Sequence, residues 1–130
     1  MKIGVISLGC AKNLVDTENL LGLLHTSKQE ITTDYEEADA IIINTCGFIE
    51  SAKVEAINTI LDVADLKEHH LKKLIVMGCL AQRYKPDLEK EMPEVDRFVA
   101  IDEYSNLGTI LSEVLGEKIA NNYGKAPRLL

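Results

Sequence analysis

Short apolar runs alternate along the chain with segments whose apolar residues repeat at helical spacing, and this alternation constrains the fold more than any other feature. Runs rich in β-branched residues predict buried strands at residues 3–8, 40–44 and 74–77, and a shorter one at 98–101. A weaker candidate at 30–33 precedes an acidic turn and is typical of a sheet edge.

Four helices are expected between and after these strands. The first begins at Asp16 as N-cap and reaches His25, and the second runs from Ile49 to Ala64 with one apolar face. The third stretch, 80–88, is expected to be divided by Pro86 into a turn and a short helix. The last begins after Ser105 as N-cap, and Gly116 suits its C-terminal end.

Strands that alternate with helices predict right-handed βαβ crossovers and a sheet that is covered on both faces. The expected fold class is therefore α/β, a flavodoxin-like or Rossmann-like three-layer sandwich with a mostly parallel sheet of four to five strands. We prefer the flavodoxin-like strand order 2-1-3-4-5, because the weak second strand then lies at an edge. A length of 130 residues, 46% of them apolar, is typical of one domain with a real core.

Charge and cysteine content exclude several classes of protein. The 14 basic and 21 acidic residues give a net charge of −7, which does not favour strong binding to nucleic acid. No apolar run approaches the length of a membrane span. Three cysteines are too few for a disulfide scaffold and indicate a reducing compartment. We expect a cytoplasmic, monomeric protein.

The three cysteines, Cys10, Cys46 and Cys79, each follow a predicted strand and each have a glycine beside them in sequence. The carboxyl ends of parallel strands form the ligand crevice of an open α/β sheet. With strands about 4.8 Å apart, the three thiols are expected within roughly 5 to 10 Å of one another. Helix N-termini after Cys46 and Cys79 would favour thiolates there. This placement predicts a shared, thiolate-bound polynuclear centre.

The alternative is that each cysteine is a small buried hydrophobe. Zinc would normally recruit a fourth ligand, but His25, His69 and His70 are expected at the surface, away from the crevice. An iron–sulfur cubane takes four thiolates, so three cysteines would leave one iron open to another ligand.

Other candidate sites in the sequence are weaker. Glycine-rich phosphate-binding motifs are absent, and no C-x-x-C pair indicates thioredoxin-like chemistry. An acidic turn is interpreted as solvated rather than metal-binding; its residues are Asp34, Glu36, Glu37 and Asp39. Three residues beside Cys10 could orient a ligand or cap the first helix: Lys12, Asn13 and Asp16.

Three separated motifs, in order, resemble those of the N-terminal domain of radical S-adenosylmethionine methylthiotransferases. They are SLGCAKNLVDTE from Ser7, NTCGFI from Asn44 and GCLAQRY from Gly78. The first two resemble the branch that modifies an aspartate of a small-subunit ribosomal protein. The alternative branch, which modifies tRNA adenosine, reads closer to YGCQMN in the first motif.

The resemblance implies an auxiliary [4Fe–4S] cluster bound by Cys10, Cys46 and Cys79, which would present the sulfur for methylthiolation. A second [4Fe–4S] cluster, which cleaves S-adenosylmethionine, would belong to a following domain whose C-x-x-x-C-x-x-C motif is absent here. The implied organisation is a cluster domain at 1–117 and a linker at 118–130, inactive as a transferase by itself. A non-metallated α/β ligand-binding or interaction domain remains the other alternative.

Overall fold

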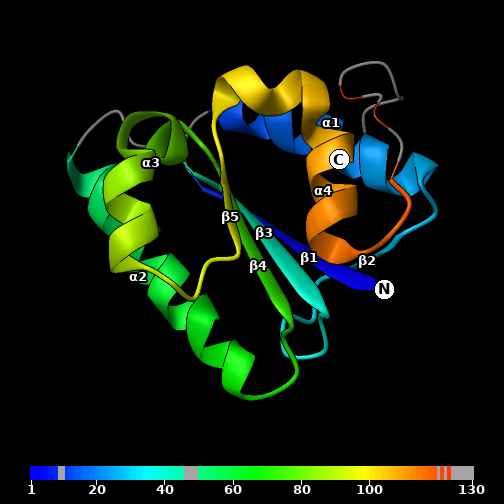
Figure 1. Ribbon diagram of the computed structural model, residues 1–130, viewed down its shortest axis with the longest axis horizontal. Helices are drawn as coiled ribbons and strands as arrows, with labels where there is room; N and C mark the ends of the chain where they lie inside the picture. Colours follow the sequence, from blue (N-terminus) through cyan, green and yellow to red (C-terminus); the bar gives the residue numbers. More distant parts are fainter. Residues whose placement is uncertain (9–10, 46–49, 120, 122, 124–130) are drawn as a thin grey trace.

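A five-stranded, all-parallel sheet with helices on both faces forms the protein, as shown by a computed structural model (Figure 1). The structure describes residues 1–8, 11–45, 50–119, 121 and 123. The strand order is β2-β1-β3-β4-β5, which confirms the predicted α/β class and the preferred order 2-1-3-4-5. Within the described residues, no helix is both long and apolar enough to span a bilayer.

All five predicted strands are present, with small changes at their ends. Their bounds are β1 Lys2–Ser7, β2 Glu30–Thr32, β3 Ala40–Thr45, β4 Lys73–Gly78 and β5 Arg97–Val99. Every residue of β3 is buried, whereas β2 has only three residues and is largely exposed. Burial on both sheet faces explains the unbroken apolar sequence of the central strands.

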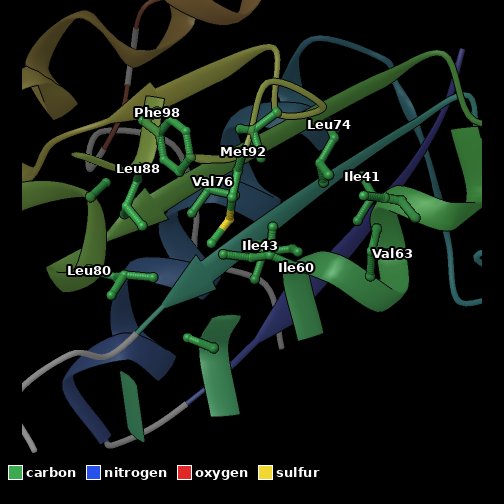
Figure 2. Close-up of a cluster of buried hydrophobic side chains, with 14 of the residues drawn as sticks. Ile41, Ile43, Ile60, Val63, Leu74, Val76, Leu80, Leu88, Met92 and Phe98 are labelled. Atoms are coloured by element: carbon green, nitrogen blue, oxygen red, sulfur yellow. The ribbon is translucent and has the colours of Figure 1, made fainter. Parts of the chain in front are cut away.

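The helices are α1 Ala11–Thr26, α2 Glu50–Ala64, α3 Cys79–Glu91 and α4 Leu107–Leu115, with 3-10 helices η1 Asp65–Glu68 and η2 Ile101–Asn106. Alternate residues of the central strands point to opposite faces of the sheet, so the core has two parts. On one face, Ile41, Ile43 and Val76 pack with side chains from α2 and α3 (Figure 2). On the other, Ile42 and Ile75 pack with side chains from α1 and α4.

The first helix begins earlier than predicted. It starts at Ala11, so Asp16 lies inside α1 and is not its N-cap. The Asp16 carboxylate instead accepts a hydrogen bond of 2.9 Å from the Tyr123 hydroxyl. A contact between residues 107 positions apart carries no local signal, which is why the helical pattern alone misplaced the start.

The predicted break at Pro86 is also wrong, because α3 runs through Pro86 as one helix. Proline inside a helix costs about 3 kcal/mol relative to alanine. Leu80 and Leu88, on either side of Pro86, are both buried in the same core cluster. Their burial offsets the local cost and holds both halves of α3 against the sheet.

The start of the last helix differs from the prediction, and its end agrees. Ser105 lies within η2, and Asn106 occupies the N-cap position of α4 without a capping side-chain bond. The 3-10 turns satisfy backbone groups that a serine cap would otherwise bind. Gly116 ends α4 in the left-handed conformation with φ of 70°, as its position predicted.

Candidate functional site

The carboxyl ends of β1, β3 and β4 lie side by side at one edge of the sheet (Figure 1). Their register pairs Ser7 with Asn44, Asn44 with Met77 and Thr45 with Gly78. Cys46 and Cys79 each follow the last residue of a strand directly, and Cys10 comes three residues after β1. Cys10 and Cys46 lie outside the described residues, so the convergence of the three thiols stays a prediction.

Cys79 is the first residue of α3 and is 4% exposed. The preceding Gly78 occupies the N-cap position with φ of 103°, a conformation that side chains rarely adopt. A Cβ at Gly78 would collide with the carbonyl oxygen of Thr45 and lie 2.8 Å from Asn44 Oδ1. Glycine at 78 therefore lets two strand ends approach closely and turns the chain directly from β4 into α3.

The N-cap residue of α3, Gly78, has no side chain that could cap the helix. Thr45, which is fully buried on the neighbouring strand β3, provides the capping hydroxyl group instead. Its hydroxyl donates to the carbonyl oxygen of Met77 at 2.7 Å and accepts from the Leu80 backbone N–H at 3.3 Å. These two bonds flank Cys79 on both sides in sequence. The thiol is thus attached to a backbone that is fixed to β3, at the positive end of the α3 dipole, where an anion is favoured.

A second polar group joins β1, β3 and α1 at the same edge. Asn44 Nδ2 donates to Thr17 Oγ1 at 3.1 Å, and the Thr17 hydroxyl donates to Ser7 Oγ at 2.9 Å. The backbone N–H of Leu8 donates to the Asn44 carbonyl oxygen at 2.9 Å. These bonds fix the backbone that leads from β1 toward Cys10.

The buried polar side chains of the described chain all lie at this edge: Thr17, Asn44 and Thr45. The quoted motifs contain these three residues, but the sequence analysis gave them no role in the site. The available signal was the abrupt change from the apolar run Ala40–Ile43 to Asn44 and Thr45, because a polar pair that ends a buried strand needs internal partners.

Two tyrosines, Tyr104 and Tyr123, pack together beside Asp16 of α1. The rings of Tyr104 and Tyr123 are in contact, with centroids 5.2 Å apart, and Tyr123 donates to Asp16. Burial is the main cause that raises the pKa of Tyr104, and the nearby charges of Asp16 and Cys79 add to it. Burial likewise raises the pKa of Tyr123, together with its hydrogen bond to Asp16. Both phenols are therefore neutral hydrogen-bond donors at neutral pH.

The histidines lie away from this edge, as predicted. His25 is exposed in the last turn of α1, and His69 is exposed after η1. The third, His70, lies 2.9 Å from Asp39 Oδ1, and both line an open depression at the amino end of the sheet with Met1 and Lys2. Among the described residues, no group of three metal-ligating side chains occurs.

The acidic turn is only partly solvated. Asp34, Glu36 and Glu37 are exposed, as expected. Asp39, in contrast, accepts a hydrogen bond of 2.8 Å from the Lys2 backbone N–H, which lowers the pKa of its carboxyl group, with His70 contributing. Asp39 therefore has a structural role at the amino edge.

Lys12 and Asn13 lie in the first turn of α1, near the carboxyl edge.

Comparisons with known proteins agree with the three motifs. The family described as "Uncharacterized protein family UPF0004" matches residues 2–100. The ribosomal protein uS12 methylthiotransferase RimO of Acetivibrio thermocellus is 55% identical over 121 residues, which are 93% of this chain and 27% of that protein. The RimO proteins of Clostridioides difficile and Natranaerobius thermophilus are 53% and 47% identical over 88% and 99% of the chain, which covers 26% and 29% of their lengths. The chain thus spans little more than a quarter of these relatives.

Proposed function

Because the chain belongs to the UPF0004 family and is similar to RimO methylthiotransferases over most of its length, we propose that it binds an auxiliary [4Fe–4S] cluster. Cys10, Cys46 and Cys79 would be its ligands. Three thiolates leave one iron open, and when bound the cluster would supply a site for the sulfur that is transferred. The observation that carries this proposal is the alignment of β1, β3 and β4, whose carboxyl ends precede the three cysteines.

The described residues fit an anionic cluster at this edge. Cys79 lies at the positive end of α3, and Gly78 presents bare backbone where a Cβ could not be accommodated. The start of a helix is typical of sites that hold anions, and Gly78 lets the ends of β3 and β4 lie close together there. The neutral Tyr104 phenol of η2 adds a hydrogen-bond donor at the same end of the sheet.

The residues of the chain would hold the cluster ligands in place. Thr45 fixes the turn that carries Cys79 through its bonds to Met77 and Leu80. The Asn44–Thr17–Ser7 bonds fix the end of β1, which leads toward Cys10. Ligands on fixed backbone need little reorganisation when a cluster binds, which favours binding.

For a protein that contains this chain we propose methylthiotransferase activity on the ribosomal protein uS12, as in the names of the relatives, with an aspartate as the modified residue, as the resemblance of the motifs implies. In this proposal, residues 1–117 are the cluster domain and 118–130 the linker to a radical S-adenosylmethionine domain with its own [4Fe–4S] cluster. The chain itself would be monomeric, cytoplasmic and inactive as a transferase. Its net charge of −7 favours a protein substrate over nucleic acid.

Iron and acid-labile sulfide analysis after anaerobic reconstitution tests the cluster. We expect about four irons and four sulfides per chain, with an absorbance band typical of [4Fe–4S] clusters. Cys10→Ala, Cys46→Ala and Cys79→Ala should each lose most of the bound iron. His69→Ala and His70→Ala are the controls and should retain it, because both histidines are exposed and lie away from the carboxyl edge.

Unchanged iron content in Cys46→Ala would contradict the three-ligand assignment. A reconstituted wild-type chain without iron would favour a non-metallated ligand-binding or interaction domain. An open iron has a separate test, since added sulfide or methanethiol should change the electron paramagnetic resonance spectrum of the reduced cluster. A spectrum indifferent to both ligands would contradict the open position.

A further inference from the structure

The hydroxyl group of Tyr104 is buried and has no hydrogen-bond partner among the described residues. The whole residue is only 6% exposed. A buried phenol without a partner costs stability, so its retention at one position needs an explanation. The hydroxyls of Tyr35 and Tyr123, in comparison, donate to Val5 O and to Asp16.

The fold places η2, which carries Tyr104, at the same end of the sheet as Cys79, the residue that follows β4. Strands β4 and β5 are neighbours, with Met77 opposite Val99, so α3 and η2 both start from the same edge of the sheet (Figure 1). The Asp102 backbone N–H donates to Gln82 Oε1 at 3.4 Å, which joins η2 to the first turn of α3. Cys79 begins that turn.

Glu103 fixes the backbone next to Tyr104. Its carboxylate accepts from the Ala100 backbone N–H at 2.9 Å and from Lys85 Nζ at 3.0 Å, and it also binds Arg97. The contact with the Tyr123 ring restricts the Tyr104 side chain. The phenol is therefore held in position, and after burial the charges of Asp16 and Cys79 both act to raise its pKa.

We propose that the Tyr104 hydroxyl donates a hydrogen bond to anionic sulfur at the Cys79 end of the cluster site. The acceptor would be the Cys79 thiolate or a cluster sulfide beside it, so the inference rests on the proposed function. A hydrogen bond to sulfur withdraws electron density and stabilises the reduced cluster, which raises its reduction potential. Tyr104 is thus a residue that tunes the cluster, not one of its ligands.

Tyr104→Phe tests this inference because it removes only the hydroxyl group. In the anaerobically reconstituted chain, we expect the variant to bind as much iron as wild type but to have a more negative reduction potential. Electron–nuclear double resonance of the reduced cluster should detect a D₂O-exchangeable proton in wild type that is lost in the variant. Tyr123→Phe is the matched control, since its hydroxyl donates to Asp16, and it should keep both properties.

The outcomes separate the two proposals. A wild-type chain that builds no cluster overturns both of them. Clusters with equal potentials and equal proton couplings in wild type and Tyr104→Phe overturn the role of Tyr104 alone. Equal shifts in Tyr104→Phe and Tyr123→Phe would assign the effect to packing of the ring pair and overturn it too. So would a lower melting temperature of cluster-free Tyr104→Phe, since it would show that the hydroxyl has a partner within the protein.

Discussion

Single residues at the carboxyl edge determine how closely the strand ends approach. Gly78 has a left-handed backbone and leaves no room for a Cβ against Thr45. Gly116 also has a positive φ, of 70°, but nothing lies within 4 Å of its Cβ position. Alanine substitutions at the two glycines therefore differ in one respect: both place a side chain at a positive φ, but only the one at Gly78 also causes a steric collision.

We expect Gly78→Ala to lower the free energy of unfolding by about 3 kcal/mol or more, because the strain of a positive φ adds to a clash with backbone. Gly116→Ala, the control, should cost only about 1 kcal/mol. Urea denaturation followed by circular dichroism measures both. Equal losses in the two variants would contradict the close approach of Thr45 to Gly78.

The ionised carboxylate of Asp39 makes the stability of the fold depend on pH in the acid range. The Lys2 backbone N–H, the largest cause, and His70 lower the pKa of Asp39 in the folded state, partly against desolvation. The stability from ionised Asp39 is therefore fully present above its unfolded pKa of about 4, and is lost as pH falls through the lower folded value.

Asp39→Asn should therefore be less stable than wild type at pH 7, with a difference that shrinks below about pH 4. Melting temperatures measured between pH 7 and pH 3 test this expectation. Glu36→Gln, at an exposed position in the same turn, serves as the control and should follow the wild-type curve. A constant difference between Asp39→Asn and wild type at all pH values would show that the carboxylate charge is not involved.

At the scale of elements, the sequence predicted the strands better than the helix ends. All five strands were predicted, the central ones because burial on both faces leaves an unbroken apolar signal. The exposed edge strand β2 was the weaker candidate. The starts of α1 and α4 were misplaced because Asp16 binds distant Tyr123 and Ser105 lies in η2. Local capping rules take no account of tertiary contacts. The hydrogen bonds of Thr45 were not predicted for the same reason, because they join residues that are distant in sequence.

The continuous α3 yields a prediction about its proline. Pro86 lies in the helix interior, while Leu80 and Leu88 hold the helix on the core. Pro86→Ala should raise the free energy of unfolding by about 1 to 3 kcal/mol, because the strong helix penalty of proline exceeds its restriction of the unfolded chain. Asp87→Ala, exposed in the same helix, should change it by about 0.5 kcal/mol or less.

Denaturation of the two variants under identical conditions measures the difference. A loss of stability in Pro86→Ala would contradict this expectation and show that the packing of α3 requires the proline ring.

At the scale of the whole molecule, the edge of the sheet where the strands begin, the amino edge, and the edge where they end, the carboxyl edge, have different roles. The amino edge carries exposed charges and the Asp39–His70 contact. Buried polar side chains gather at the carboxyl edge, where Thr17, Asn44 and Thr45 fix the strand ends. The sequence predicted that the three cysteines follow strands whose carboxyl ends are neighbours, and the strand order confirms that these strands are neighbours. The shared site itself stays a prediction. The supporting bonds were not visible, because they join residues distant in sequence.

The end of the described chain also contributes to the core. Ile119 is 6% exposed and packs among the side chains of α1 and α4, and its backbone N–H and carbonyl oxygen both bind the Ser112 hydroxyl. Tyr123 contacts Tyr104 and donates to Asp16. The predicted domain boundary at 117 stays a prediction, and these contacts show how to test it.

A chain that ends at Lys118 should lose about 3 kcal/mol or more of stability, because it lacks the buried Ile119 side chain and the Tyr123 contacts. Ile119→Ala in the full chain should account for about 2 to 4 kcal/mol of that loss, while Lys118→Ala, exposed, should change stability by about 0.5 kcal/mol or less. Thermal and urea unfolding measure all three. A shortened chain as stable as the full one would place the boundary at 117, whereas the expected loss makes residues 119–123 part of the domain and shortens the linker accordingly.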